Sequence, residues 1–154
     1  MISNTRHSDA VVASPTAKFG LTEVTRGLFA GAGGLSRLVR IVGMPLASEL
    51  ALTGRHMSAQ EAKSIGAINR IASSQESVVD EAVELAALIA SQSPDAVIVT
   101  RAGLRESWEV ASAEKASQNT SERYQRALMT AENTKIGLMA FAQKKKPQWI
   151  GSKL

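Results

Sequence analysis

The sequence predicts an α/β chain in which a few short strands precede a long helical region. Three observations support this fold class. Aromatic residues make up only 4% of the chain, and the alanine and aliphatic side chains that supply most of its apolar volume favour helices over aromatic-rich strands. Short apolar runs bounded by turn residues lie near the N-terminus, and apolar residues at helical spacing fill the second half.

The first half is expected to combine short strands, a glycine-rich loop and short helices. Two strands, at about residues 9–13 and 17–19, are joined by a Ser-Pro-Thr turn. The glycine-rich residues 27–34 lead into a helix that Gly43 closes. Pro45 suits the first turn of the next helix, which Gly54 ends.

A capping box and a left-handed cap define the next two elements. Ser58 and Glu61 have the spacing of a capping box, which predicts a helix over residues 59–65. Gly66 suits a left-handed C-cap, and residues 67–71 are then extended.

The second half is expected to be helical throughout. Apolar residues at i, i+4, i+7 and i+11 from Val78 to Ile89 form one stripe. Ser93 as N-cap, with proline after it, opens a second helix. Further helices are expected at about residues 113–131 and 133–146.

Length and composition are those of one globular unit. The chain has 154 residues, of which 44% are hydrophobic. Without cysteine it can form no disulfide, thiolate metal site or thiol nucleophile. No apolar run approaches the roughly 18 residues of a membrane span, so we expect no membrane partner.

The net charge of +4 is concentrated in a basic C-terminal tail. The lysines of this tail are Lys144, Lys145, Lys146 and Lys153. Such a tail can bind nucleic acid, anionic lipid or a phosphate-bearing ligand, or it can solvate a helix end and complement the helix dipole. Charge alone does not choose among these alternatives.

Three candidate sites are weak. His7, Ser8 and Asp9 are adjacent in the chain and cannot form the chain of contacts of a hydrolase triad. The two histidines are too isolated to bind a metal, so no metal is predicted. Residues 31–34 precede a helix, where N–H groups can bind phosphate, but they lack the nucleotide-binding glycine motifs. A tight turn is the commoner explanation for such a loop.

Glu23 is the most interesting single acid. It follows a predicted strand and precedes the glycine-rich loop, a position in which a carboxylate can act as a general base. No second acid, histidine or lysine stands at a diagnostic spacing. From the residues alone, a surface carboxylate is the commoner explanation.

The chain ends in Ser152-Lys153-Leu154, a tripeptide that addresses proteins to the peroxisome. Chance would place it there in about one chain in two thousand. We therefore expect a peroxisomal protein with a peroxisomal import receptor as a partner. Recognition requires the residues after Trp149 and Ile150 to be free rather than packed.

Segments spread over nearly the whole chain, from residue 8 to residue 149, have an order and spacing that match those of one family. These segments are residues 9–14, 17–24, 26–28, 31–38, 50–55, 58–62, 66–71, 93–97 and 140–149. Together they resemble the C-terminal half of the enoyl-CoA hydratase/isomerase, or crotonase, family. The resemblance implies a crotonase-like fold, truncated to the end of its core (residues 1–72), a helical oligomerisation region (73–149) and a targeting tail (150–154).

The same resemblance implies hydration of 2-trans-enoyl-CoA thioesters in fatty-acid β-oxidation. Coenzyme A is part of the substrate, so no further cofactor and no nucleic acid are expected. Glu23 would act on a water or proton at the acyl chain, and the N–H of Gly31 would help to hold the water. Phe141 and Lys144 would bind the adenine and phosphates of coenzyme A in a trimer or a pair of trimers, unless Phe141 is a core residue of the last helix.

Departures from the family pattern predict weak activity. Thr22 stands where the family usually has proline, which predicts a looser turn. The family's second glutamate would fall near Ser3, and its two oxyanion-hole N–H groups lie upstream of this sequence. Such donors each lower the barrier by about 3 to 4 kcal/mol, so the chain alone is expected to show little activity. An isomerase, a non-catalytic oligomerisation partner of full-length relatives and a truncated gene model are the alternatives.

Overall fold

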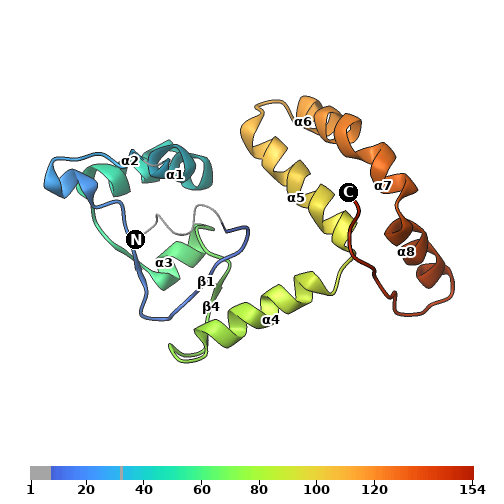
Figure 1. Cartoon of the computed structure of the whole chain (residues 1–154). Coiled ribbons are helices and arrows are strands. Elements are labelled where there is room, and N and C mark those ends of the chain that lie inside the picture. Colours follow the sequence, from blue (N-terminus) through green and yellow to red (C-terminus); the bar gives the residue numbers. More distant parts are fainter. Residues whose placement is uncertain (1–7, 32) are drawn as a thin grey trace. The chain divides into compact units, whose positions relative to one another are not determined.

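The computed structural model describes residues 8–31 and 33–154, which form two compact units. The first unit extends to Glu84, and the second runs from Leu85 to Leu154. The boundary falls inside helix α4 (Val78–Ala90). In Figure 1 the first unit is coloured blue to green, and the second runs from yellow-green to red.

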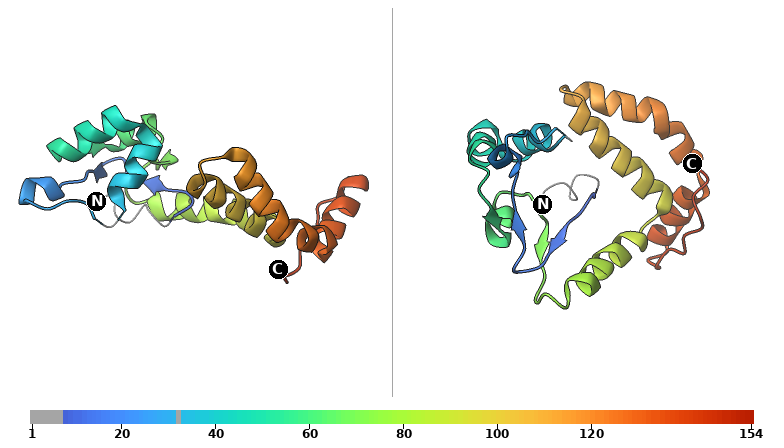
Figure 2. Two further views of the ribbon diagram at one scale, coloured as in Figure 1. Left: turned by 90° about the horizontal axis from the view of Figure 1, so that it is seen from above. Right: turned by 60° about the vertical axis from the view of Figure 1, so that its left-hand side comes forward.

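The described strands of the first unit form two small sheets, seen again from other sides in Figure 2. Strand β1 (Val12–Ala13) pairs in parallel with β4 (Arg70–Ile71). Strand β2 (Lys18–Phe19) pairs antiparallel with β3 (Met57–Ser58). The sheets therefore join the start of the unit to segments about forty to sixty residues further along the chain.

The two strands expected near the N-terminus are present, but they do not pair with each other. The turn between them is closed by the N–H of Ala17, which donates to the carbonyl of Ser14 at 3.0 Å. Instead, β1 pairs with β4 and β2 pairs with β3. Each of the two N-terminal strands contributes one buried residue, Ala13 in β1 and Phe19 in β2. Tertiary packing decides the pairing, because the turn alone is compatible with either arrangement.

Local capping signals place three helices of the first unit where the sequence predicts them: α1 (Gly34–Val42), α2 (Met44–Thr53) and α3 (Ala59–Ser64). The sequence does not predict the 3-10 turn η2 (Glu23–Arg26). Gly54 ends α2 with a φ of 67°, and Gly66 follows α3 with a φ of 74°. The Ser58 hydroxyl accepts the N–H of Glu61 at 3.1 Å, which confirms the predicted cap.

An ion-pair cluster ties the end of α2 to the start of α3. Arg55 binds Glu49 through Nε and Glu61 through a terminal nitrogen, each at 2.7 Å. The Arg55 guanidinium is the main reason why the pKa of Glu61 is lowered, and the Ser58 N–H lowers it further. The carboxylate of Glu61 thus interacts both with Arg55 and, as the capping box predicts, with the N–H of Ser58.

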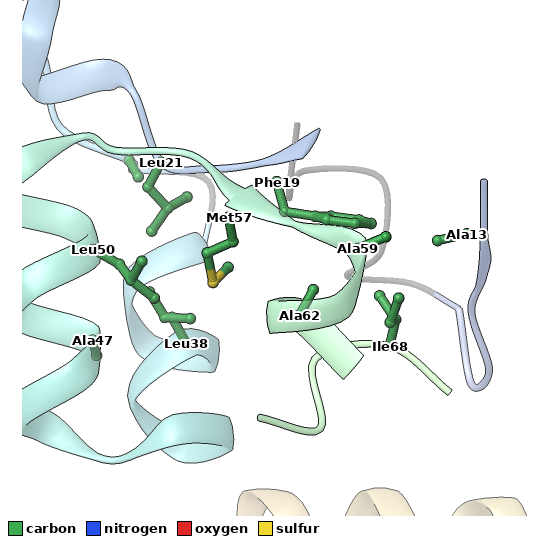
Figure 3. Packing of buried hydrophobic residues seen from close by; sticks show 11 residues of the cluster. Ala13, Phe19, Leu21, Leu38, Ala47, Leu50, Met57, Ala59, Ala62 and Ile68 are labelled. Carbon is green, nitrogen blue, oxygen red and sulfur yellow. The ribbon is translucent and has the colours of Figure 1, made fainter. Parts of the chain in front are cut away.

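The core of the first unit lies between its sheets and helices. Figure 3 shows Met57 of β3 beside Leu50 of α2 and Leu38 of α1, and Phe19 of the paired strand β2 beside Ala59. Leu50 and Met57 are each 1% exposed. Burial of one such side chain contributes about 1.5 to 3 kcal/mol, so this cluster fixes the strand that leads directly to Glu23.

The second unit consists of helices in the described residues. These are the end of α4, α5 (Pro94–Glu109), α6 (Ala113–Thr120), the π-helical turn η3 (Ser121–Gln125), α7 (Arg126–Thr130) and α8 (Glu132–Ala142). The expected helix over residues 113–131 is confirmed, with the π-helical turn inside it. Helix α6 packs against α5 (Figure 1).

The last helix ends earlier than the expected residue 146. The N–H of Lys144 donates to the carbonyl of Phe141 at 3.1 Å, and that of Lys145 to Ala140 at 2.9 Å. This is a Schellman end, and Lys144 occupies its left-handed position with a φ of 53°. The basic cluster therefore follows the helix instead of extending it.

The second unit buries little apolar surface by itself. Among its described residues, Ala116 is the single apolar side chain that is fully buried. Large apolar side chains that stay exposed include Ile98, Leu104, Met129, Leu138 and Met139. Exposed apolar surface of this extent marks an interaction surface.

Within the described residues, no single helix is long and apolar enough to span a membrane. The bent pair of α4 and α5 reaches the threshold only when its two helices are taken together.

Candidate functional site

Glu23 is held at the start of a well-bonded turn. It follows Leu21, which is 3% exposed, and opens η2. The Thr22 carbonyl accepts both the N–H and the hydroxyl of Thr25, at 3.1 and 2.7 Å. The carbonyl of Glu23 itself accepts the N–H of Leu28 at 3.0 Å. Threonine in place of the usual proline therefore does not leave the turn unbonded.

The carboxylate of Glu23 is the unusual feature of this turn. The side chain is partly buried, and its Oε2 atom is buried without a hydrogen-bond partner among the described residues. A buried carboxylate oxygen without a partner is unfavourable and rare, and such atoms occur at catalytic or binding sites. Exposed apolar side chains lie on the same turn or just after it: Val24, Leu28 and Phe29. The carboxylate thus has one free acceptor beside apolar surface.

Gly54 allows the Glu23 turn to lie close against the end of α2. A Cβ atom at position 54 would stand 2.6 Å from Cγ2 of Thr25 and 3.2 Å from Cγ1 of Val24. The φ of 67° at Gly54 also disfavours any other residue there. The capping glycine that ends the helix is therefore also the residue that makes room for the turn.

The glycine-rich loop has the structure of a tight turn. Gly33 has a φ of 81° and caps α1, while Ala32 lies outside the described residues. The N–H of Gly31, expected to hold a water, donates to the carbonyl of Phe29 at 2.8 Å. It can bind a water only when this three-residue turn opens.

Phe141 and Lys144 lie at the exposed end of α8. The Phe141 ring is 85% exposed, so it is not a core residue of this chain. Lys144 is exposed as well and stands at the left-handed position just described. Both side chains are available to a ligand, and they belong to the second unit, whereas Glu23 and Gly31 belong to the first.

The chain is packed at Trp149 and Ile150, just before the C-terminal tripeptide, whereas Lys153 and Leu154 are exposed. The indole N–H of Trp149 donates to the carbonyl of Ser91 at 3.0 Å. Further along, the N–H of Leu154 donates to the hydroxyl of Ser152 at 3.2 Å, and Leu154 remains 41% exposed. The tail is thus docked on the helices of its own unit.

Asp95 and Asn133 hold this tail, and sequence reasoning assigned neither of them a role. Both are 2% exposed. Nδ2 of Asn133 donates to Oδ2 of Asp95 and to the carbonyl of Ile150, each at 2.9 Å, and Oδ1 of Asn133 accepts the N–H of Ile150 at 3.0 Å. Asp95 stands in the first turn of a helix, where an exposed acid is the ordinary expectation, so no local signal announces its burial.

Asp95 lines one hollow together with Lys153 and Leu154. The Ser152 hydroxyl is the main cause of its lowered pKa, followed by the Asn133 amide, and the Lys153 N–H adds to them. Oδ1 of Asp95 nevertheless lacks a well-formed hydrogen bond. Because the folded pKa lies below the unfolded value of about 3.9, the ionised carboxylate stabilises the docked tail above that pH. This contribution is lost as the pH falls through the lowered pKa.

The remaining candidates contribute no site. His7 and Ser3 lie outside the described residues, so neither the rejected triad nor the position of the second glutamate can be placed. In the part of the chain that the structure describes, no cluster of three or more acidic or histidine side chains could hold a metal.

Known proteins resemble this chain over nearly its whole length. A family model described as enoyl-CoA hydratase/isomerase matches residues 6–152. Two mevalonyl-coenzyme A hydratases are each 46% identical to the chain. That of Beauveria bassiana aligns over 96% of this chain and 52% of its own length. That of Aspergillus fumigatus aligns over 95% of this chain and 54% of its own length.

A solved structure shows the same fold. The enoyl-CoA hydratase of Mycobacterium tuberculosis superposes with a TM-score of 0.86 at 34% identity, covering 94% of this chain and 56% of that one. The chain spans about half the length of the curated relatives it matches. The family needs no separate cofactor, because coenzyme A is part of its substrate. The chain belongs to the enoyl-CoA hydratase/isomerase family, also called the crotonase family, and has its fold.

Proposed function

We propose that this chain is part of a hydratase that adds water reversibly across the double bond of a 2-enoyl-CoA thioester, with Glu23 as an acid–base residue. The observation that carries this function is the buried Oε2 atom of Glu23, which has no partner among the described residues. Hydration joins the water oxygen to C3 and a proton to C2. A carboxylate with a free acceptor can take the proton that the water gives up.

The surroundings of Glu23 suit this chemistry. The backbone bonds of the turn fix the position of the side chain without using its carboxylate. Val24, Leu28 and Phe29 offer apolar surface to an acyl chain. An apolar neighbourhood also strengthens the interaction between the carboxylate and a bound water, because the local dielectric is low.

Similarity to mevalonyl-coenzyme A hydratases favours a mevalonyl thioester or its dehydrated form as the substrate. An unbranched enoyl-CoA of fatty-acid β-oxidation is the second candidate, favoured by the peroxisomal tripeptide at residues 152–154. Both substrates present the same enoyl thioester to Glu23, so the choice between them concerns the acyl pocket.

A chimera provides the test of this function. The N-terminal half of the Aspergillus relative is joined in front of residue 8, and the product is offered dehydrated mevalonyl-CoA and crotonyl-CoA. Hydration of either thioester that depends on Glu23 supports the proposal. A folded chimera that binds coenzyme A but hydrates neither thioester contradicts it and favours a non-catalytic oligomerisation role.

Phe141 and Lys144 are proposed to bind coenzyme A within a trimer or a pair of trimers. The exposed ring offers adenine a face for stacking, and the ammonium group can form charge-assisted bonds with phosphate. Lys144→Gly in the chimera is expected to weaken coenzyme A binding about tenfold, as the loss of a hydrogen bond between charged groups predicts. Titration calorimetry at two salt concentrations measures this loss.

Two controls isolate the lysine charge. Glycine relieves the left-handed backbone at position 144, so a weaker affinity cannot be attributed to strain. Lys146→Gly removes the same charge two residues later. Equal affinities for all three proteins, with equal salt dependence, would show that Lys144 is not a ligand.

Peroxisomal import is proposed from the C-terminal tripeptide. Fusion of a fluorescent protein to the N-terminus is expected to give punctate fluorescence, and deletion of Leu154 is expected to make it diffuse, because the import receptor reads the free end. Microscopy in cells without a full-length relative excludes import by association. Puncta that survive the deletion in such cells would remove the targeting proposal.

A further inference from the structure

The last residues of the chain turn back along the second unit instead of leaving it. After the Schellman end of α8, the tail in Figure 1 returns beside α8 towards the start of α5. The Trp149 ring passes over Gly137 so closely that a Cβ atom there would stand 3.0 Å from the ring. Gly137 thus leaves space for the ring, while the indole N–H is bound to Ser91.

Asn133 binds both backbone polar groups of one tail residue, Ile150. Its amide accepts from the N–H of Ile150 and donates to the carbonyl of Ile150, as a neighbouring strand would. The second hydrogen of Nδ2 is given to Asp95. All three bonds are protected, because Asn133 and Asp95 are nearly inaccessible to water.

The tripeptide follows directly after the residue that Asn133 holds. Ile150 is bound through both its N–H and its carbonyl, and Lys153 and Leu154 line one hollow together with Asp95. A receptor that reads Ser152-Lys153-Leu154 needs the preceding backbone to be accessible. Docking of Ile150 on Asn133 and receptor binding therefore compete for the same stretch of backbone.

The attachment can open. A hollow of about 700 Å³ lies beside the tail and is lined by Asp95, Asn133, Lys153 and Leu154, among others. The attachment also leaves one buried polar atom unsatisfied, because Oδ1 of Asp95 has no hydrogen-bond partner among the described residues. Leu154 is already partly exposed.

We propose that Asp95 and Asn133 form a latch that holds the tail on the helical unit at Ile150, just before the C-terminal tripeptide, so that an import receptor binds only the molecules in which this latch is open. The inference rests on the proposed peroxisomal targeting. The apparent dissociation constant then equals the intrinsic constant divided by the open fraction. If about one molecule in ten is open, the chain binds the receptor about tenfold more weakly than a free peptide does.

The test measures receptor binding in solution. The purified peptide-binding domain of the peroxisomal import receptor is titrated with the whole chain and with a free peptide of residues 148–154. Asn133→Ala is expected to bring the affinity of the whole chain to within about twofold of the peptide. Trp149→Phe, which removes the bond to Ser91 and part of the ring that packs over Gly137, is expected to have a smaller effect in the same direction.

A matched control tests whether the effect is local. Asn119 lies in the same unit and donates to Glu106 at 2.6 Å, far from the tail in sequence. Asn119→Ala also removes an amide hydrogen bond but is expected to leave receptor affinity unchanged. Circular dichroism shows which variants keep their helices. If Asn133→Ala loses helix, Trp149→Phe decides the matter.

Each outcome has a separate meaning. The latch proposal is overturned, and the targeting proposal remains, if two results are found together. The whole chain binds the receptor as tightly as the peptide does, and the amide of Ile150 exchanges its hydrogen as fast as in the peptide. If the receptor does not bind the free peptide, the targeting proposal is overturned, and the latch proposal, which rests on it, is overturned as well. Equal gains from Asn133→Ala and Asn119→Ala would also overturn the latch, since loosening of the whole unit would then explain the effect.

Discussion

The 154-residue chain alone is expected to hydrate crotonyl-CoA at least about 10⁴-fold more slowly than the chimera that carries an upstream half. By resemblance, both oxyanion-hole N–H groups of the family lie upstream of this sequence. Each such donor lowers the barrier by about 3 to 4 kcal/mol, and each 1.36 kcal/mol corresponds to a factor of ten in rate. Two donors together therefore account for a difference of this size.

Loss of enoyl absorbance, followed at equal concentrations of both proteins, measures this difference. The upstream half alone, purified in the same way, serves as the control for contaminating hydratase. Rapid hydration by the 154-residue chain would contradict the prediction. Other N–H groups, such as that of Gly31 after its turn opens, would then have to stabilise the thioester oxygen.

Glu23→Gln in the chimera is expected to lower kcat by about 10² to 10⁴, the range typical of a lost acid–base group. The amide has nearly the same shape as the carboxylate, and the turn is held by backbone bonds, so the fold is expected to remain. The side chain also gives up no hydrogen bond on substitution, because its buried oxygen has no partner among the described residues.

Glu84→Gln is the matched control, since it removes the same charge from an exposed position on α4. Steady-state kinetics separate the two effects: kcat falls for Glu23→Gln with KM nearly unchanged, and neither constant changes for the control. An active Glu23→Gln variant would show that another group handles the proton.

Element positions could be predicted where one residue carries a local signal. Gly43, Gly54 and Gly66 end helices in left-handed or extended conformations that other residues adopt with difficulty, and Ser58 starts a helix with its own hydroxyl. Strand pairing could not be predicted in this way. The parallel register of Val12 with Arg70 depends on packing between distant segments.

The end of the last helix shows the limit of such signals. A run of lysines favours helix continuation, yet Lys144 adopts the left-handed conformation that glycine usually supplies. Lysine gives no sign of this in the sequence. The unfavourable backbone conformation is offset by the two Schellman hydrogen bonds and keeps the lysines out of the helix.

The sequence predicts where Glu23 lies in the chain, but it does not predict which atoms surround its side chain. The order of residues placed Glu23 after a strand, and the structure agrees. The burial of its Oε2 atom is a feature of the folded chain that sequence spacing does not reveal. The same holds for Asp95 and Asn133, which are 38 residues apart and share a hydrogen bond that neither residue type requires.

The small apolar core of the second unit would tie its stability to mass action if the chain assembles as proposed. A second copy that covers side chains such as Leu104 and Leu138 would stabilise the folded unit more strongly as its concentration rises. Dilution would remove that contribution, whereas the first unit keeps the core around Leu50 and Met57. At low concentration we therefore expect the helical unit to open first, and proteases to cut there before they reach Glu23.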